Sequence, residues 1–273
     1  MNHQLPLQVV KSSTGDGQRL DVAGLNEITV LIDRSRTALT EVGINRWHSG
    51  LEGPPHFHDS KEQIFYVLNG TATITVGRDA YRVRPGDLIY VPRGTMHRTV
   101  VDAGKELVYL LFNAFSDEEK EGHASFADHI AKVKQTRRRQ ADEAADGAAV
   151  DWVRSDGNGI HVAAESDATE VSETATRLVN IRSLIAASAT FRCSADLVRL
   201  AANGRWLHDL MGNTPVEKTH YVLEGAATVR VDGEAWPVTA GDLIYVPEGR
   251  NVTIESGDGG VELLSLQTFV DRP

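Results

Sequence analysis

The segment Gly50–Gly70, GLEGPPHFHDSKEQIFYVLNG, decides how the rest of the chain is interpreted. It places His56 and His58 one residue apart, and an apolar run then leads to the closing glycine. In an extended chain, residues i and i+2 point to the same face, so the two imidazoles can aim at one point. A third histidine, His97, ends the segment GDLIYVPRGTMH. Three imidazoles with one side-chain oxygen would suit a first-row transition metal.

Short runs rich in β-branched and aromatic residues surround this segment, and Gly, Pro and Asp separate them. Strand-like runs precede it at residues 27–33 and 37–47, and others follow it up to residue 115, among them TATITV, DLIYVP and ELVYLLFNAF. Many short strands at close spacing are typical of an all-β barrel or sandwich and not of alternating strands and helices. The first domain is therefore predicted to cover residues 1–115.

The composition changes at Ser116. Residues 116–150 are charged and rich in alanine, and Phe126, Ile130 and Val133 lie at helical spacing. This pattern predicts a charged helical linker. Strand-like runs return after it, so residues 151–273 are predicted to form a second domain.

The second domain repeats the first. Residues 62–94 align without a gap on residues 217–249, an offset of 155, and 18 of these 33 positions are identical, including YVL and GDLIYVP. The pair Arg46-Trp47 recurs as Arg205-Trp206, which indicates a role in packing or in an ion pair. Self-similarity over this length indicates a duplicated β-domain.

The two copies differ where the first copy carries its histidines. Val252 stands in place of His97, Lys218 stands in place of Gln63, and the segment RWLHDLMGNTPVEK has no His-x-His pair. A lysine ammonium has no lone pair to offer a cation. We therefore expect one metal ion, bound in the first domain only. For the second domain, the retained packing residues indicate a mechanical role in covering apolar surface, and the alternative is an anion-binding site at Lys218 and His220.

Both histidine segments resemble motifs of the cupin family. GLEGPPHFHDSKEQIFYVLNG is similar to the first cupin motif, in which His-x-His is followed by an acid or amide and then by a glycine, and GDLIYVPRGTMH is similar to the second. The second domain keeps the second motif as GDLIYVPEG, without its histidine. The resemblance implies a bicupin, with two small antiparallel barrels of the double-stranded β-helix type on either side of the helical linker. It also implies a metal ion inside the first barrel, bound by His56, His58, Gln63 and His97.

The fourth ligand is either Gln63 or Glu62. Counting back from Gly70 puts the family's ligand position on Gln63, whereas counting on from His58 puts it on Glu62. Only one of two adjacent strand residues can face inward without a bulge. We favour Gln63, because strand and turn geometry fix the span to the glycine, and because Glu217 persists in the copy without ligands, as a surface residue would. Three neutral imidazoles and a neutral amide would leave the ion its full +2 charge to attract an anionic, chelating substrate.

Composition narrows the class of protein. The 273 residues carry a formal charge of −10 and the sequence pI is about 5.5, which argues against nucleic acid or an acidic membrane as a partner. The N-terminal residues lack the pattern of a signal peptide, no apolar run is long enough to cross a membrane, and the single Cys193 fits a reducing compartment. We expect a cytoplasmic protein that acts on a small molecule and forms a homodimer.

Three classes of function fit these observations. The first, which we favour, is a metal-dependent dioxygenase, because four protein ligands leave positions for a bidentate substrate and for oxygen. The second is a non-redox isomerase, decarboxylase or cyclase that uses the metal as a Lewis acid, since His-His-Gln-His sets resemble those of some cupin isomerases and cyclases. The third is a non-catalytic, ligand-binding bicupin. Fe2+ is the favoured ion for the first class, and Mn2+, Ni2+ and Zn2+ are the alternatives.

Overall fold

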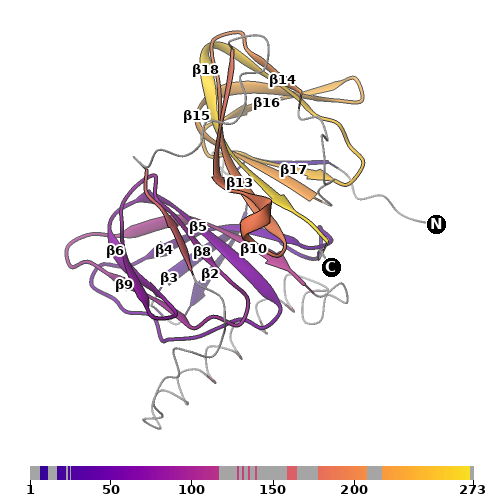
Figure 1. Cartoon of the computed structure of the whole chain (residues 1–273). Coiled ribbons are helices and arrows are strands. Elements are labelled where there is room, and N and C mark those ends of the chain that lie inside the picture. Colours follow the sequence, from indigo (N-terminus) through magenta and orange to yellow (C-terminus); the bar gives the residue numbers. More distant parts are fainter. Residues whose placement is uncertain are drawn as a thin grey trace. The chain divides into compact units, whose positions relative to one another are not determined.

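The computed structural model describes residues 7–11, 17–22, 24, 26–116, 128, 131, 135, 139, 159–164, 178–207 and 217–270. The chain forms two compact units, and Figure 1 shows that both are built from strands. We call Gln18–Ser166 the first barrel, and Met1–Gly17 together with Asp167–Pro273 the second barrel.

The first barrel contains a seven-stranded sheet and a three-stranded sheet, with the spatial orders β11-β8-β5-β10-β4-β3-β2 and β7-β6-β9. Neighbouring strands are antiparallel throughout. The strands are β2 (Gln18–Val22), β3 (Asn26–Ile32), β4 (Thr40–Trp47), β5 (Lys61–Asn69), β6 (Ala72–Val76), β7 (Asp79–Val83), β8 (Leu88–Val91), β9 (His97–Val101), β10 (Leu107–Phe115) and β11 (Ile160–Val162). The all-β prediction is confirmed, and strands β3 to β10 lie within or beside the runs that predicted them, whereas no run predicted β2.

Side-chain alternation along β5 decides which residues face the interior of the first barrel. Phe65 and Val67 belong to an apolar core that also contains Ile89 and Val91 of β8. Because strand residues alternate between faces, Gln63 shares the inward face with Phe65, and Glu62 lies on the opposite one. Residues 62–67 are all buried, so both faces of β5 are covered and hydrophobic alternation is not visible in its sequence.

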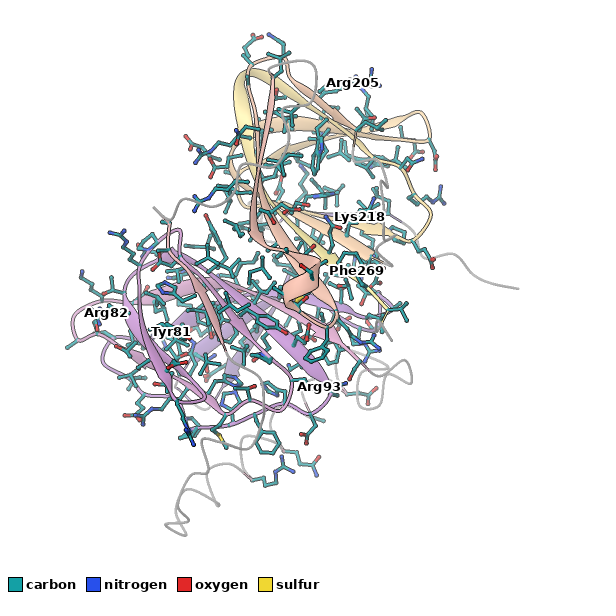
Figure 2. All side chains as sticks on the ribbon, viewed as in Figure 1. Tyr81, Arg82, Arg93, Arg205, Lys218 and Phe269 are labelled. Carbon is teal, nitrogen blue, oxygen red and sulfur yellow. The ribbon has the colours of Figure 1, made fainter. Side chains whose placement is uncertain are left out.

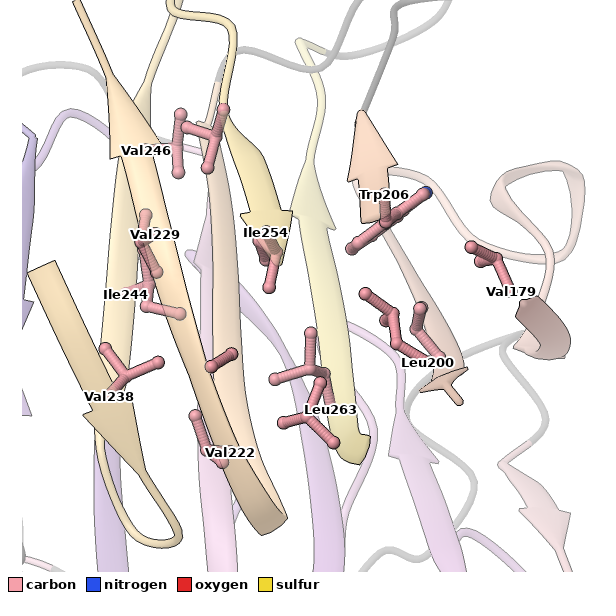
Figure 3. Close-up of a cluster of buried hydrophobic side chains, with 14 of the residues drawn as sticks. Val179, Leu200, Trp206, Val222, Val229, Val238, Ile244, Val246, Ile254 and Leu263 are labelled. Atoms are coloured by element: carbon pink, nitrogen blue, oxygen red, sulfur yellow. The ribbon is translucent and has the colours of Figure 1, made fainter. Parts of the chain in front are cut away.

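The second barrel has an eight-stranded sheet in which β1-β17-β15-β18-β13-β12 are neighbours, with β14 beside β18 and β16 beside β15. Its apolar core, drawn in Figure 3, includes Val222, Ile244 and Leu263. The strands are β1 (Gln8–Val10), β12 (Val179–Ile185), β13 (Cys193–Leu200), β14 (Arg205–Leu207), β15 (Glu217–Val231), β16 (Glu234–Thr239), β17 (Leu243–Pro247) and β18 (Thr253–Thr268), and a 3-10 turn spans Ala187–Ala189.

Two short strands each extend the sheet of the more distant repeat. β1, at the start of the chain, pairs with β17 of the second barrel, where Val9 is opposite Ile244. β11, which follows the linker, pairs with β8 of the first barrel, where His161 is opposite Ile89. The compact units therefore divide the chain differently from the predicted domains at 1–115 and 151–273, because these strands cross the expected boundaries.

The same repeat position anchors both added strands. In the first barrel, Asp87 Oδ1 accepts a hydrogen bond from the backbone N–H of Ala164 at 2.8 Å, and Oδ2 lies 3.2 Å from His161 Nε2. In the second barrel, Asp242 Oδ2 lies 2.9 Å from Lys11 Nζ. The two aspartates are 155 residues apart, the offset of the repeat. In both repeats the aspartate also accepts a hydrogen bond from the backbone N–H three residues before it, that of Arg84 at 3.1 Å or of Thr239 at 2.9 Å, so it serves the turn as well as the added strand.

The helical linker is not confirmed. The elements of the described residues are strands and one 3-10 turn, and no α-helix is among them. Between residues 117 and 158 only Asp128, Ala131, Gln135 and Arg139 are described, each with helical backbone. The prediction for 116–150 therefore falls almost wholly outside the described residues. Within the described part of the chain, no helix is long and apolar enough to cross a membrane.

The repeated Arg-Trp pair has both of the predicted roles. Trp47 is buried in the first core and donates from Nε1 to the hydroxyl of Tyr109 at 3.0 Å. Arg46 forms an ion pair with Glu106 at 2.7 Å. In the second barrel, Trp206 is likewise a core residue.

Candidate metal centre

Backbone pairing brings the histidines of the two motifs together. The N–H of His56 donates to the carbonyl of His97 at 3.0 Å, and the N–H of His97 donates back to the carbonyl of His56 at 2.8 Å. The N–H of Gly94 donates to the carbonyl of His58 at 2.8 Å. These bonds hold the loop of the first motif against the turn that precedes β9, so a tight turn and one antiparallel bridge position all three imidazoles.

The three imidazoles form one cluster. One ring nitrogen from each of His56, His58 and His97 lies within 4.8 Å of the others. Ring centroids are 4.2 Å apart for His56 and His97, and 5.0 Å apart for His56 and His58. On a common ion with bonds of about 2.1 Å, such nitrogens would be about 3 to 4 Å apart, so small ring movements suffice to bind one. Within the described residues, this is the one group of three such side chains.

Backbone carbonyls fix the tautomers of two of the histidines. His56 Nδ1 lies 3.0 Å from the carbonyl oxygen of Pro54, and His97 Nδ1 lies 3.0 Å from that of Thr95. A carbonyl oxygen can only accept, so Nδ1 of each ring must be the protonated nitrogen. The lone pair of each neutral ring then lies on Nε2, as in histidine ligands whose other nitrogen is held by a hydrogen bond.

The amide of Gln63 is buried and only half satisfied. Its Nε2 donates to Asn113 Oδ1 at 2.9 Å, and Asn113 Nδ2 donates to Glu41 Oε1 at 2.7 Å. Gln63 Oε1 has no hydrogen-bond partner among the described residues, although the side chain is only 4% exposed. Because an ionised carboxylate can only accept, Glu41 sets the direction of both bonds and so the orientation of the Gln63 amide. A buried oxygen without a donor is suited to a cation.

Glu62 is engaged on the other face of β5. Its carboxylate accepts a hydrogen bond from the hydroxyl of Tyr90 at 2.7 Å, and it is 2% exposed. In the second barrel, Tyr245 makes the same bond to Glu217, which is also 2% exposed. The interpretation of Glu217 as a surface residue is therefore wrong. The acid persists in both copies because it pairs with a buried tyrosine.

An apolar layer lies next to the row of Glu41, Asn113 and Gln63. In it, Leu111 of β10 is opposite Gly43 of β4 and Phe65 of β5, and Phe65 is opposite Ile89 of β8. The rings of Phe65 and His97 have centroids 6.1 Å apart. Phe65 of this layer therefore lies beside the histidine cluster.

At two equivalent positions of the second barrel that the structure describes, a valine and a lysine stand in place of His97 and Gln63. Val252 is 1% exposed and belongs to the apolar core, and Lys218 is 4% exposed on the inward face of β15. Figure 2 labels Lys218 in that barrel.

Sequence reasoning missed Glu41 and Asn113. The signal for Asn113 was the single amide inside the run LVYLLFNAF, residues 107–115, all of which are buried in β10. Glu41 carried no signal by itself, because it becomes part of the site only through the register that sets it opposite Asn113.

Comparison with known families identifies both halves of the chain. The family model described as "Cupin domain" matches residues 46–113 and 212–265. Two curated relatives match shorter segments. An uncharacterized protein of Methanocaldococcus jannaschii is 37% identical over 43 residues, or 16% of this chain and 34% of the relative. An uncharacterized protein of Streptomyces coelicolor is 39% identical over 44 residues, or 16% of this chain and 39% of the relative. The matching segments thus span little more than a third of each relative.

Solved structures resemble the chain over its whole length. A glyoxylate-induced protein from Pseudomonas aeruginosa has a TM-score of 0.71 at 15% identity, covering 100% of this chain and 91% of that one. An 11S globulin from Wrightia tinctoria has a TM-score of 0.66 at 14% identity, covering 99% and 85%. Oxalate decarboxylase from Bacillus subtilis, which has Mn(II) centres, has a TM-score of 0.64 at 15% identity, covering 98% and 78%. At these identities the likeness concerns the fold alone.

Proposed function

Because the chain belongs to the cupin superfamily, as a bicupin with two cupin domains, we propose that it is a metal-dependent enzyme of small-molecule metabolism with its metal centre in the first barrel. The proposed ligands are Nε2 of His56, His58 and His97 and the side-chain oxygen of Gln63. The observation that carries the proposal is the convergence of the three imidazoles within 4.8 Å. A bound divalent ion would supply Lewis acidity and, if it is iron, one-electron chemistry with oxygen.

The residues of the chain prepare the site for a cation. The carbonyls of Pro54 and Thr95 hold a proton on Nδ1 of His56 and His97, which leaves Nε2 as the donor atom. The bond to Asn113 engages Nε2 of Gln63, which leaves its oxygen as the atom that can bind a cation. These hydrogen bonds limit the orientations of the donor atoms, which favours the binding of an ion.

The proposed ligands are all neutral, which favours an anionic substrate. Among the described residues assigned to this site, Glu41 is the acid, and it is linked to Gln63 through Asn113. A small acid with two oxygen donors would bring the missing negative charge. The apolar layer of Phe65, Leu111 and Ile89 would shield the reacting atoms from water on the inner side.

A dioxygenase is the reaction class we favour. Four protein ligands leave about two positions on a six-coordinate ion, which a chelating acid could fill, or one oxygen of the acid together with dioxygen. The second candidate is a non-redox decarboxylase, isomerase or cyclase. The neutral ligand set favours it, since an ion with an undiminished +2 charge stabilises an enediolate strongly. A ligand-binding protein without catalysis is the third reading.

Oxygen uptake distinguishes these classes. Protein reconstituted separately with Fe2+, Mn2+, Ni2+ and Zn2+ would be screened against enolisable and catecholic acids, with uptake and product formation followed together. A dioxygenase consumes oxygen with the iron form and is inactive with zinc. Turnover of a substrate by the zinc or nickel form without oxygen consumption would establish the non-redox class. Binding of acids without turnover by any form would contradict an enzymatic role.

A further inference from the structure

The interior of the second barrel carries a polar layer where the first barrel is apolar. In the first barrel, Gly43, Leu111, Phe65 and Ile89 form one row across four strands. In the second barrel, the corresponding row is Asp196 of β13, Ser265 of β18, His220 of β15 and Ile244 of β17. Three of these four positions carry a polar residue in the second barrel. We call Asp196, Ser265 and His220 the polar layer.

The polar layer faces the barrel interior. On each strand, the residues two positions away from it belong to the apolar core, namely Val198 on β13, Leu263 on β18 and Val222 on β15. Figure 3 shows Val222 and Leu263 within that core. By strand alternation, the members of the polar layer point to the same side.

Its members are covered from solvent to different degrees. His220 and Ser265 are 0% exposed, whereas Asp196 is partly exposed. Ser265 Oγ has no hydrogen-bond partner among the described residues. A buried hydroxyl without a partner is costly, and a barrel kept only for packing gains nothing from a serine where its sister barrel has leucine. Ser265 is therefore better explained by a ligand than by packing, whereas the ring of His220 also packs edge-on against that of Trp206 at 5.4 Å.

The row of residues next to the polar layer contains a positively charged side chain, that of Lys218. Lys218, 4% exposed, lies two residues before His220 on the inward face of β15 and opposite Gln267 of β18. Gln267 Nε2 approaches Asp196 Oδ2 at 3.5 Å, which ties the two rows together. Lysine is a point charge for an anion, and the imidazole of His220 and the hydroxyl of Ser265 beside it can donate hydrogen bonds to the oxygen atoms of that anion.

We propose that the second barrel is a separate binding site for a small carboxylate, in which Lys218 pairs with the carboxylate, and Ser265 and His220 of the polar layer donate hydrogen bonds to its remaining oxygens. The site needs no metal, and it is independent of the function proposed for the first barrel. Lys218 takes the place of Gln63, and His220 takes the place of Phe65. The repeat position of Gln63 and Lys218 would therefore bind a cation in the first barrel and an anion in the second. The mechanical role expected from the sequence is the competing explanation.

The test uses full-length protein stripped of metal with a chelator, so that the first site cannot contribute. Binding of oxalate, lactate and malonate is measured by titration calorimetry and by the shift in melting temperature. The matched variants are Lys218→Gln and Ser265→Leu, each of which installs the residue of the first barrel, and His97→Ala is the control in the other site. Circular dichroism establishes that each variant is folded.

We expect the metal-free protein and His97→Ala to bind at least one of these acids at one site per chain. Lys218→Gln should weaken that binding about tenfold or more, since a charge-assisted bond is lost. Ser265→Leu should weaken it as well. The proposal is overturned if no acid binds the metal-free protein, or if binding survives Lys218→Gln and disappears with His97→Ala. Neither result would bear on metal binding by the first barrel.

Discussion

Gln63 donates its amide N–H to Asn113 at 2.9 Å and keeps its oxygen without a hydrogen-bond partner among the described residues. Its neighbour Glu62 is already bonded to Tyr90 on the other face of the strand. The contrast predicts that Gln63→Ala lowers metal affinity by about tenfold or more, while Glu62→Ala changes metal affinity little and lowers stability instead. Competition with a metal-binding dye, combined with urea unfolding, measures both effects. A larger loss of affinity in Glu62→Ala would reverse the assignment.

Glu41 fixes the direction of the bonds that orient Gln63. Glu41→Gln keeps the size of the side chain but can donate as well as accept, so the Asn113 and Gln63 amides would no longer have one preferred orientation. We expect metal affinity to fall by about 10- to 100-fold with all three histidines intact. The same dye competition reads out the change. Unaltered affinity in a folded Glu41→Gln variant would show that the chain of amides does not matter for the ion.

The strands β1 and β11, each of which extends the sheet of the more distant repeat, predict how fragments of the chain behave. A fragment of residues 1–115 lacks β11, so the edge of β8 is uncovered and Asp87 loses its contacts with Ala164 and His161. Open sheet edges promote aggregation. We expect this fragment to be poorly soluble, whereas residues 18–166 should remain in solution and bind metal. Gel filtration and metal analysis of the two fragments provide the comparison, and equal behaviour would contradict the role given to β11.

Burial raises the pKa of Asp196 to about 6 from its ordinary value of 3.8, and the hydrogen bond with Ser183 opposes this. In the folded protein the carboxyl stays neutral until about pH 6, whereas in the unfolded chain it ionises near pH 4. Asp196 therefore favours the folded state at low pH, and this contribution to the free energy of unfolding is lost as the pH rises from about 4 to 6. The groups that face Asp196 are Ser183 of β12, Ser265 and Gln267 of β18, and, beyond them on β15, His220 and Lys218.

Asp196→Asn removes this titration. Its stability relative to the natural protein should increase between pH 4 and pH 7, by at most about 3 kcal/mol. Denaturant unfolding at several pH values measures the difference. A difference that does not change with pH would mean that Asp196 is not held neutral by burial.

Much of the site could be predicted from the sequence, because its histidines belong to local patterns. His56 and His58 are adjacent in the first motif, and the turn residues before His97 fix where that strand begins. Other features depend on register between distant strands. Glu41 meets Asn113 only through pairing of β4 with β10. The strands β1 and β11 are three residues long, too short to leave a hydrophobic period. The burial of Glu217 depends on the residues that cover the outer face of its sheet, and the sequence of the strand itself does not predict them.

The most direct test of the central claim is the metal content of the full-length protein and of its His97→Ala variant, measured by elemental analysis after purification without added chelator. We predict one divalent transition metal ion per chain in the natural protein. His97→Ala should contain far less metal and keep its circular dichroism spectrum, because the second barrel folds with Val252 at the same position. Two ions per chain, or one ion retained by folded His97→Ala, would contradict a single centre built on His56, His58 and His97.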